Sequence, residues 1–183
     1  AIDIGWVNVT LANADYSMVD RYLGYKQGIG ANGAAGGAEI NLPAKYDYLN
    51  IKEYVSADNF TTASYQKWTD ACAAGQANRT LKAPDQPQVD TYALNLQTAY
   101  NALELKGANY AALDEIIGEI NQNTNETVEV VDPANSANNY TIPYYSAEYL
   151  ATMQAKIAER DNSLVILQQD KVDNLTAALE DMY

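Results

Sequence analysis

The amino-acid sequence predicts an all-α protein made of two tandem small three-helix bundles, with long loop insertions between helix 1 and helix 2. Two observations support this fold class. Three segments recur in the same order along the 183-residue chain, and each carries apolar residues at steps of three and four, the spacing of one helical face. We therefore expect residues 1–13 to be the tail of a preceding unit or a linker, residues 14–106 to form repeat 1 and residues 107–183 to form repeat 2.

The first helix of each repeat follows from two matching runs. Residues 14–20 read ADYSMVD and residues 108–114 read ANYAALD. Asp15 and Asn109 stand where a side chain is wanted to cap the first helical turn. The apolar residues that follow share one helical face: Tyr16, Val19 and Leu23 in repeat 1, and Tyr110, Leu113, Ile117 and Ile120 in repeat 2.

The second and third helices recur in the same way. In the second helix, Phe60, Trp68 and Cys72 align with Tyr145, Met153 and Ile157, and the candidate caps are Thr61 or Thr62 and Ser146. In the third helix, the apolar stripe of Val89, Tyr92, Leu96, Ala99 and Leu103 aligns with Val172, Leu175, Leu179 and Met182. Gly107 is a candidate left-handed stop after the first of these third helices.

Two insertions interrupt the pattern at the same place in each repeat, between the first and the second helix. Residues 30–45 are rich in Gly and Ala, and residues 121–139 are rich in Asn around Asp132 and Pro133. Residues 46–55 could add a short helix to repeat 1. Residues 6–10 read as a strand, and the alignment sets Val9 and Leu11 opposite Leu103 and Leu105. We expect the chain to be part of a longer array of such units.

These stretches resemble the FIVAR repeats of secreted and wall-anchored proteins of Gram-positive bacteria. The resemblance lies in residues 14–20, 79–83 (RTLKA), 89–93 (VDTYA), 102–108 (ALELKGA), 145–148 (YSAE) and 168–173 (QQDKVD). It implies an all-helical repeat used as a spacer or interaction module beside catalytic or adhesive domains, with a suggested sugar-binding role and no catalytic residues. The two insertions and the first ten residues depart from the family's pattern.

Composition narrows the class of function. The chain has 11 Lys and Arg against 24 Asp and Glu, a net charge of −13, which argues against nucleic acid and anionic membrane surfaces as partners. No stretch approaches the length of a membrane span, so we expect no membrane insertion. The chain has no histidine, and no pair of carboxylates is marked out by spacing for acid–base chemistry. We therefore expect no enzymatic activity and no cofactor.

Cys72 is the single cysteine, lies on an apolar helix face and is expected to be a buried structural thiol. Asp132, Asn135 and Asn138 place oxygen ligands three residues apart, but they match no calcium-binding loop. We therefore predict no metal site.

Tyrosine, with 15 residues, gives the leading candidates for a ligand-binding surface. An aromatic ring with a polar tip suits shallow contacts with sugars or proteins. The alternative is that these rings anchor the long loops. The candidates near the insertions are Tyr46, Tyr48, Tyr54, Tyr140, Tyr144 and Tyr145.

Six Asn-X-Thr sequons occur, more than composition alone predicts. In a eukaryotic or archaeal secreted protein they would be glycosylation sites, whereas a Gram-positive bacterium would usually leave them bare. They lie at Asn8, Asn59, Asn78, Asn125, Asn139 and Asn174.

The sequence thus predicts a non-catalytic spacer or interaction module of an extracellular, cell-surface or cell-wall protein. Its partners would be neighbouring domains of a longer chain and a glycan or surface protein. One alternative is a carbohydrate-binding or protein-docking module that acts through the inserted Tyr-rich loops. Another is a subunit of a surface filament, in which the first ten residues add to a neighbour's sheet edge.

Overall fold

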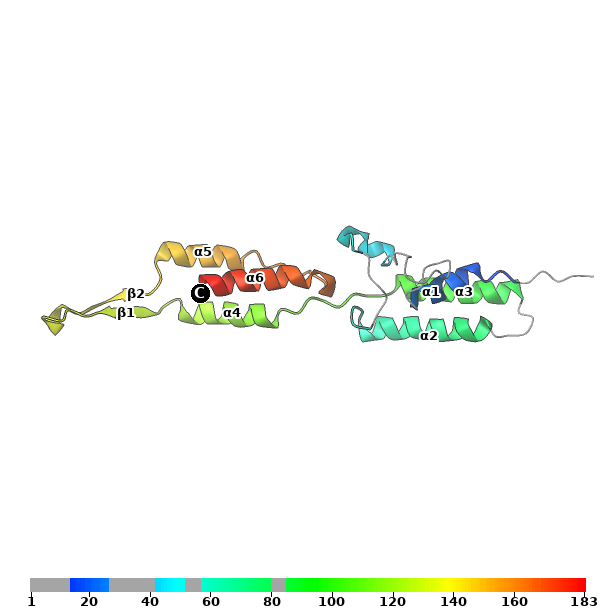
Figure 1. The fold of residues 1–183 in the computed structure, drawn as a ribbon, viewed down its shortest axis with the longest axis horizontal. Coiled ribbons are helices and arrows are strands. Elements are labelled where there is room, and N and C mark those ends of the chain that lie inside the picture. Colours follow the sequence, from blue (N-terminus) through cyan, green and yellow to red (C-terminus); the bar gives the residue numbers. More distant parts are fainter. Residues whose placement is uncertain (1–13, 27–41, 52–56, 80–84) are drawn as a thin grey trace, which may run out of the picture. The chain divides into compact units, whose positions relative to one another are not determined.

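The computed structural model describes residues 14–26, 42–51, 57–79 and 85–183. The chain is mostly helical and divides into two compact units, residues 1–105 and 106–183. The two units are described separately below (Figure 1). Residues 1–13, expected to be a tail or linker, lie outside the described residues.

Unit 1 contains the helices α1 (Ser17–Lys26), α2 (Thr62–Arg79) and α3 (Gln86–Asn101), together with the short 3-10 helix η1 (Ala44–Leu49). Each of the three α-helices packs against the other two. The buried positions lie along the predicted helix faces, because one face of each helix is apolar at steps of three and four, and Tyr22 and Tyr100 join them although the predicted stripes did not include them. They include Val19, Tyr22 and Leu23 of α1, Trp68 and Cys72 of α2, and Val89, Leu96 and Tyr100 of α3.

The chain leaves α3 in an extended conformation. Ala102 closes the helix in the right-handed region, and Leu105 then forms an isolated antiparallel bridge with Phe60. The prediction that Gly107 is the left-handed stop is wrong. Gly107 lies six residues beyond the end of α3 and bridges Val165 of unit 2.

Unit 2 contains α4 (Ala111–Asn123), α5 (Ala147–Ile157), the 3-10 turn η3 (Ile166–Gln168) and α6 (Gln169–Met182). Helix α6 packs against both α4 and α5, and Figure 1 shows the three helices side by side. Ser146 caps α5 by accepting a hydrogen bond from the Tyr149 amide at 3.1 Å. The core consists of Leu113, Ile116, Ile120, Met153, Val172 and Leu179.

The prediction of a purely α-helical protein is wrong in one place. In the Asn-rich insertion, β1 (Thr127–Val130) pairs antiparallel with β2 (Tyr140–Pro143), which directly follows the insertion, and the 3-10 turn η2 (Ser136–Asn138) lies between them. Six of the eight strand residues are β-branched or aromatic, which favours this conformation. Figure 1 shows the hairpin beyond the ends of α4 and α5, to which it is joined.

Candidate functional site

A glutamine at the start of α3 holds the start of α1. The Asp15 amide donates to Oε1 of Gln86 at 2.7 Å, and Nε2 of Gln86 donates to the Asp15 carbonyl at 3.3 Å and to the Asp90 carboxylate at 2.7 Å. The Asp15 carboxylate also caps α1 by accepting from the Ser17 amide at 2.8 Å, which lowers the pKa of Asp15. This polar cluster ties two helices together at their N-terminal ends.

An arginine at the end of α2 contacts α1 at the same end of unit 1. Arg79 makes two parallel hydrogen bonds to the Asp20 carboxylate, at 2.7 and 2.8 Å. Its guanidinium group also lies over the Tyr16 ring, 4.7 Å from the ring centre, and the Tyr16 hydroxyl donates to the Asn78 carbonyl at 3.3 Å. Arginine suits this position because its planar group pairs with a carboxylate and stacks on an aromatic face at once.

The same set of contacts occurs in unit 2. The Asn109 amide donates to Gln169 at 2.7 Å, and Gln169 donates back to the Asn109 carbonyl at 2.8 Å and to Asp173 at 2.9 Å. Arg160 pairs with Asp114 and lies 5.0 Å from the centre of the Tyr110 ring. The register that aligns Val89 with Val172 also aligns the two glutamines, and Asp90 with Asp173. Sequence comparison did not align the two arginines, because Arg160 lies three residues beyond the end of α5.

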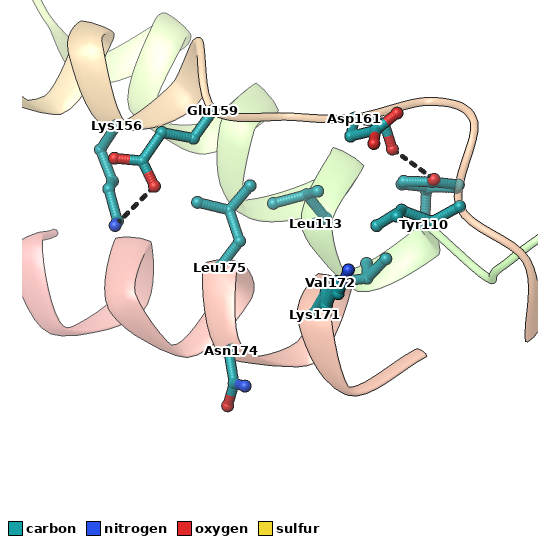
Figure 2. Close-up of a pocket in the computed structure, with 10 residues that line it drawn as sticks. Tyr110, Leu113, Lys156, Glu159, Asp161, Lys171, Val172, Asn174 and Leu175 are labelled. Carbon is teal, nitrogen blue, oxygen red and sulfur yellow. Dashed lines mark hydrogen bonds and ion pairs between the residues drawn. The ribbon is translucent and has the colours of Figure 1, made fainter. Parts of the chain in front are cut away.

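Beside this cluster, unit 2 has an open pocket of about 360 Å³ between α4, α6 and the segment that follows α5 (Figure 2). Its floor is apolar. Its wall includes Tyr110, whose hydroxyl donates to the Asp161 carbonyl at 2.5 Å. Lys156 and Glu159 form an ion pair at one end, with 2.7 Å between Nζ and Oε2. The floor residues are Leu113, Leu164, Val172 and Leu175.

The pocket follows from a shorter second helix. From the cap residue Thr61 to Arg79 is 18 residues, whereas from Ser146 to Arg160 is 14, a difference of about one helical turn. In unit 1 the last turns of α2 place Gly75 and Asn78 in the core. In unit 2 the chain instead turns away through residues 158–164, and Leu164 and Leu175 stay partly exposed above the buried Leu113 and Val172.

Charges of both signs surround this apolar floor. The hydroxyl and amide of Ser163 hold the pKa of Asp161 below its usual value, and the positive charge of Lys171 adds to this effect. The lining residues include no Ser, Thr, Cys or His. The pocket therefore combines apolar side chains with charged groups of both signs at its edge.

Of the first predicted group of tyrosines, the structure describes Tyr46 and Tyr48. Tyr46 has a structural role, because its hydroxyl donates to the Leu103 carbonyl at 3.3 Å and accepts from the Leu105 amide at 2.9 Å. Tyr48 is exposed on η1. Tyr54 lies outside the described residues.

Two members of the second predicted group, Tyr144 and Tyr145, are brought together at the start of α5, whereas Tyr140 lies on β2. The Tyr144 and Tyr145 rings meet edge to face with centres 4.8 Å apart, and Tyr145 stacks on Tyr149 at 5.7 Å. The Tyr145 hydroxyl donates to the Tyr183 carbonyl at 2.9 Å. Burial of the Tyr145 hydroxyl, helped by the neighbouring Tyr144 and Tyr183, raises its pKa above the ordinary value. Sequence analysis did not identify Tyr149 or Tyr183 as members of this cluster.

One face of the hairpin is apolar and exposed. Val128 pairs with Ile142 and Val130 with Tyr140, so these four side chains share a face. Tyr140 is 59% exposed, Ile142 45% and Val128 41%. No basic residue lies in the segment 124–146, whereas Glu126, Glu129 and Asp132 do. Exposed apolar faces with a polar rim are typical of interaction surfaces.

The sequon asparagines lie in different environments. Asn125 and Asn174 are exposed, and Asn59 and Asn139 are partly buried. Asn78 is buried in α2, so its side chain is inaccessible in the folded chain. Asn8 lies outside the described residues.

The remaining candidates are local structural features. Cys72 is buried on α2, as expected for a structural thiol. Asp132 accepts hydrogen bonds from the Asn138 amide group at 2.7 Å and from the Ala134 backbone at 2.8 Å, which lower its pKa. Across the ranges that the structure describes, no three His, Cys, Asp or Glu side chains are grouped to hold a metal ion.

Comparison with known proteins gives no relative: no family model, curated protein or solved structure matches the chain. Within the described ranges, no helix combines the length and apolar character needed to cross a bilayer.

Proposed function

We propose that the chain is a non-catalytic spacer and interaction segment of an extracellular surface protein, built from two copies of a three-helix repeat like the FIVAR repeats. The observation that supports this proposal is the recurrence of one contact set in both units. A glutamine, two acids, an arginine and a tyrosine take the same roles around the starts of the first and third helices. Two unrelated helical units would not need the same set.

A spacer needs folded units that keep their shape without a ligand. Each unit buries an apolar core of its own. The net charge of −13 keeps such a surface in solution and discourages non-specific association. The neighbouring domains of a longer protein would supply any catalytic or adhesive activity.

Matched core substitutions test the two-repeat proposal. Leu96 of α3 and Leu179 of α6 are both fully buried at aligned positions, so replacing either with Ala should cost about 2–4 kcal/mol. In a Trp6→Phe background, Trp68 fluorescence reports unit 1. We expect Leu96→Ala to lower the denaturant midpoint of this signal and Leu179→Ala to lower only a separate helical transition. Equal effects of both variants on Trp68 would reject two independent repeats.

A second candidate function is favoured by the exposed hairpin face and by Tyr144, which is 59% exposed. These side chains suit docking of a protein or a sugar. A chain with Val128, Tyr140 and Ile142 replaced by Thr would keep β-branched strand residues while losing the apolar face. Thr127→Ser and Thr141→Ser, on the opposite face, provide the control. Binding in a glycan array or surface-protein pull-down that disappears only in the first variant would replace the pure spacer with a docking module.

A further inference from the structure

Both faces of the hairpin in unit 2 are exposed. Seven of its eight strand residues are exposed, and the eighth, Val130, is half-buried. Figure 1 shows the two strands extending beyond the ends of α4 and α5. A two-stranded hairpin is only marginally stable in water, and a third strand with an apolar face stabilises it. A partner strand would therefore raise the stability of this element.

The strand register shows which backbone groups of the hairpin point outward. The Tyr144 amide donates to the Glu126 carbonyl at 2.8 Å. Because hydrogen-bonded pairs alternate along an antiparallel ladder, the pairs 128–142 and 130–140 are hydrogen-bonded as well. The residues between these pairs direct their amides and carbonyls away from the partner strand. They are Thr127 and Glu129 on β1, and Thr141 and Pro143 on β2.

The two edges of the hairpin offer different groups to a partner. On β1, the amides and carbonyls of Thr127 and Glu129 have no hydrogen-bond partner among the residues that the structure describes, so this edge supplies two donors and two acceptors. On β2, Pro143 has no amide hydrogen, and its ring lies where the donor would be. Natural sheets use proline in this way to block an edge. A new strand can therefore pair in full with β1 but not with β2.

The charge of the hairpin favours a basic partner. Glu126, Glu129 and Asp132 lie in or beside β1, and the segment 124–146 contains no Lys, Arg or His. Asn139 donates to the Glu129 carboxylate at 3.0 Å and so holds it at the hairpin. A second copy of the chain has the same acids and the same net charge of −13, so repulsion opposes pairing between two hairpins. A basic side chain directly across from Glu129 would instead stabilise the pairing.

We propose that the free edge of β1 binds an extended segment of a basic partner protein as a third strand. This inference rests on the second candidate function, in which the hairpin is a docking surface, and names the partner for it. The added strand is antiparallel, because antiparallel pairing is the more stable per residue. It places Lys or Arg opposite Glu129, and apolar residues opposite Val128 and Val130, where they extend the exposed apolar face. Main-chain hydrogen bonds supply the affinity, and the alternating side chains supply the selectivity.

A short peptide tests this pairing on the full chain. The sequence Val-Lys-Val-Thr-Lys, blocked at both ends and antiparallel to residues 126–130, places its first lysine opposite Glu129. A contact of this size gives a dissociation constant of roughly 1 mM, which amide NMR detects. At about 10 mM peptide we expect the Thr127 and Glu129 amide signals to shift and their hydrogen exchange to slow about tenfold. The Thr141 amide, on the other edge, should stay unchanged.

Two N-methylated peptides separate main-chain pairing from charge attraction. Methylation of the threonine amide removes the donor that points at the Thr127 carbonyl, and it should weaken binding about tenfold. Methylation of the central valine amide is the matched control, because this amide points away from β1 and its loss should leave binding unchanged. Equal binding of the two methylated peptides would show that the main chain of β1 is not involved, and the inference would be wrong.

A charge exchange tests the sign of the partner. Glu129→Lys should weaken binding of the lysine peptide about tenfold, and the peptide Val-Glu-Val-Thr-Lys should restore binding to this variant. Glu129→Gln keeps an acceptor for Asn139 and should weaken binding about threefold. Glu119→Gln, which removes an exposed acid of α4, is the matched control and should bind like the parent.

Three results would overturn the inference. They are unchanged Thr127 and Glu129 amides at about 10 mM peptide, protection of Thr141 instead, and self-association of the full chain through this edge in sedimentation. A glycan that binds at Tyr140 without protecting the Thr127 amide would also overturn strand addition, yet it would keep the hairpin as a docking surface. The variant with Val128, Tyr140 and Ile142 replaced by Thr decides that broader function separately. The two-repeat proposal is decided by the unfolding of the two core leucine variants.

Discussion

Gln86 holds the backbone of Asp15 with both polar atoms of its side chain, accepting from the amide at 2.7 Å and donating to the carbonyl at 3.3 Å. The contact spans 71 residues and joins the first and third helices of unit 1. Gln169 and Asn109 form the same pair in unit 2, with distances of 2.7 and 2.8 Å. A side-chain amide suits this position because it supplies a donor and an acceptor together.

Replacing either glutamine with alanine should destabilise its own unit by about 1 kcal/mol, the usual net contribution of such hydrogen bonds. Gln88→Ala is the control, since this exposed residue lies in the same turn of α3, its backbone amide bonds to the Asp85 cap, and its side chain makes no hydrogen bond to the residues that the structure describes. Urea denaturation followed by circular dichroism measures the effect. A loss no larger than that of Gln88→Ala would mean that the contact contributes nothing to stability.

Two helical glycines should respond to alanine with opposite signs. A Cβ at Gly118 of α4 meets no atom within 4 Å, so Gly118→Ala should stabilise unit 2 by about 0.5–1 kcal/mol through helix propensity. A Cβ at Gly75 of α2 would lie 3.0 Å from Cδ1 of Leu96, which is fully buried. We expect overpacking to outweigh propensity there and to cost about 1 kcal/mol net. Thermal unfolding distinguishes the two, and stabilisation by Gly75→Ala would contradict the packing described for α2 and α3.

The Ser163 hydrogen bonds to Asp161 should be detectable in an acid titration of the Asp161 carboxyl group. The pKa of Asp161 lies below the ordinary 3.8 in the folded chain, so its contribution to stability is complete above that pH and is lost as the pH falls through the folded value. Ser163→Ala removes the hydroxyl bond and should raise the pKa of Asp161 toward 3.8. Carboxyl NMR titration measures the shift, and Asp15, held by Ser17, is an internal control that should not move.

Alkali should reveal the tyrosine cluster. Because the pKa of Tyr145 is raised above the ordinary 10.0, its contribution to stability is complete below pH 10 and is lost as the pH rises through the folded value. Ultraviolet titration should show a late phase that Tyr145→Phe removes. Tyr144→Phe should leave a late phase, since burial is the main cause of the shift. A late phase that persists in Tyr145→Phe would assign it to another residue.

Helical faces were predictable because burial imposes a period that the sequence displays. Val89, Leu96 and Val172 lie in the core where the steps of three and four place them. The cap at Ser146 was also predictable, because a serine directly before an apolar helical segment is a common N-terminal cap. Contacts that depend on the tertiary structure were not predictable from the sequence. No spacing indicates that the hydroxyl of Tyr46 joins two backbone groups of residues 103–105.

The hairpin was missed because the sequence features of its two strands are separated by a long connection. Nine residues separate Val130 from Tyr140, so no two-residue turn marks the pair. The Asn-rich connection dominates the composition of the insertion, although the alternation in residues 127–130 (TVEV) was readable as a strand. The pocket of unit 2 was missed because it depends on where α5 ends, and helix ends are less regular than helix faces.

Residues 103–105 dock onto the start of α2, and this contact determines how unit 1 resists tension along the chain. A pull at Lys106 meets the Thr61–Glu104 and Tyr46–Leu105 hydrogen bonds, and the buried side chain of Leu105, before it reaches the last turn of α3. That helix is therefore shielded from peeling at its C-terminal end. The force needed to separate residues 103–105 from the start of α2 therefore sets the load at which the unit begins to extend.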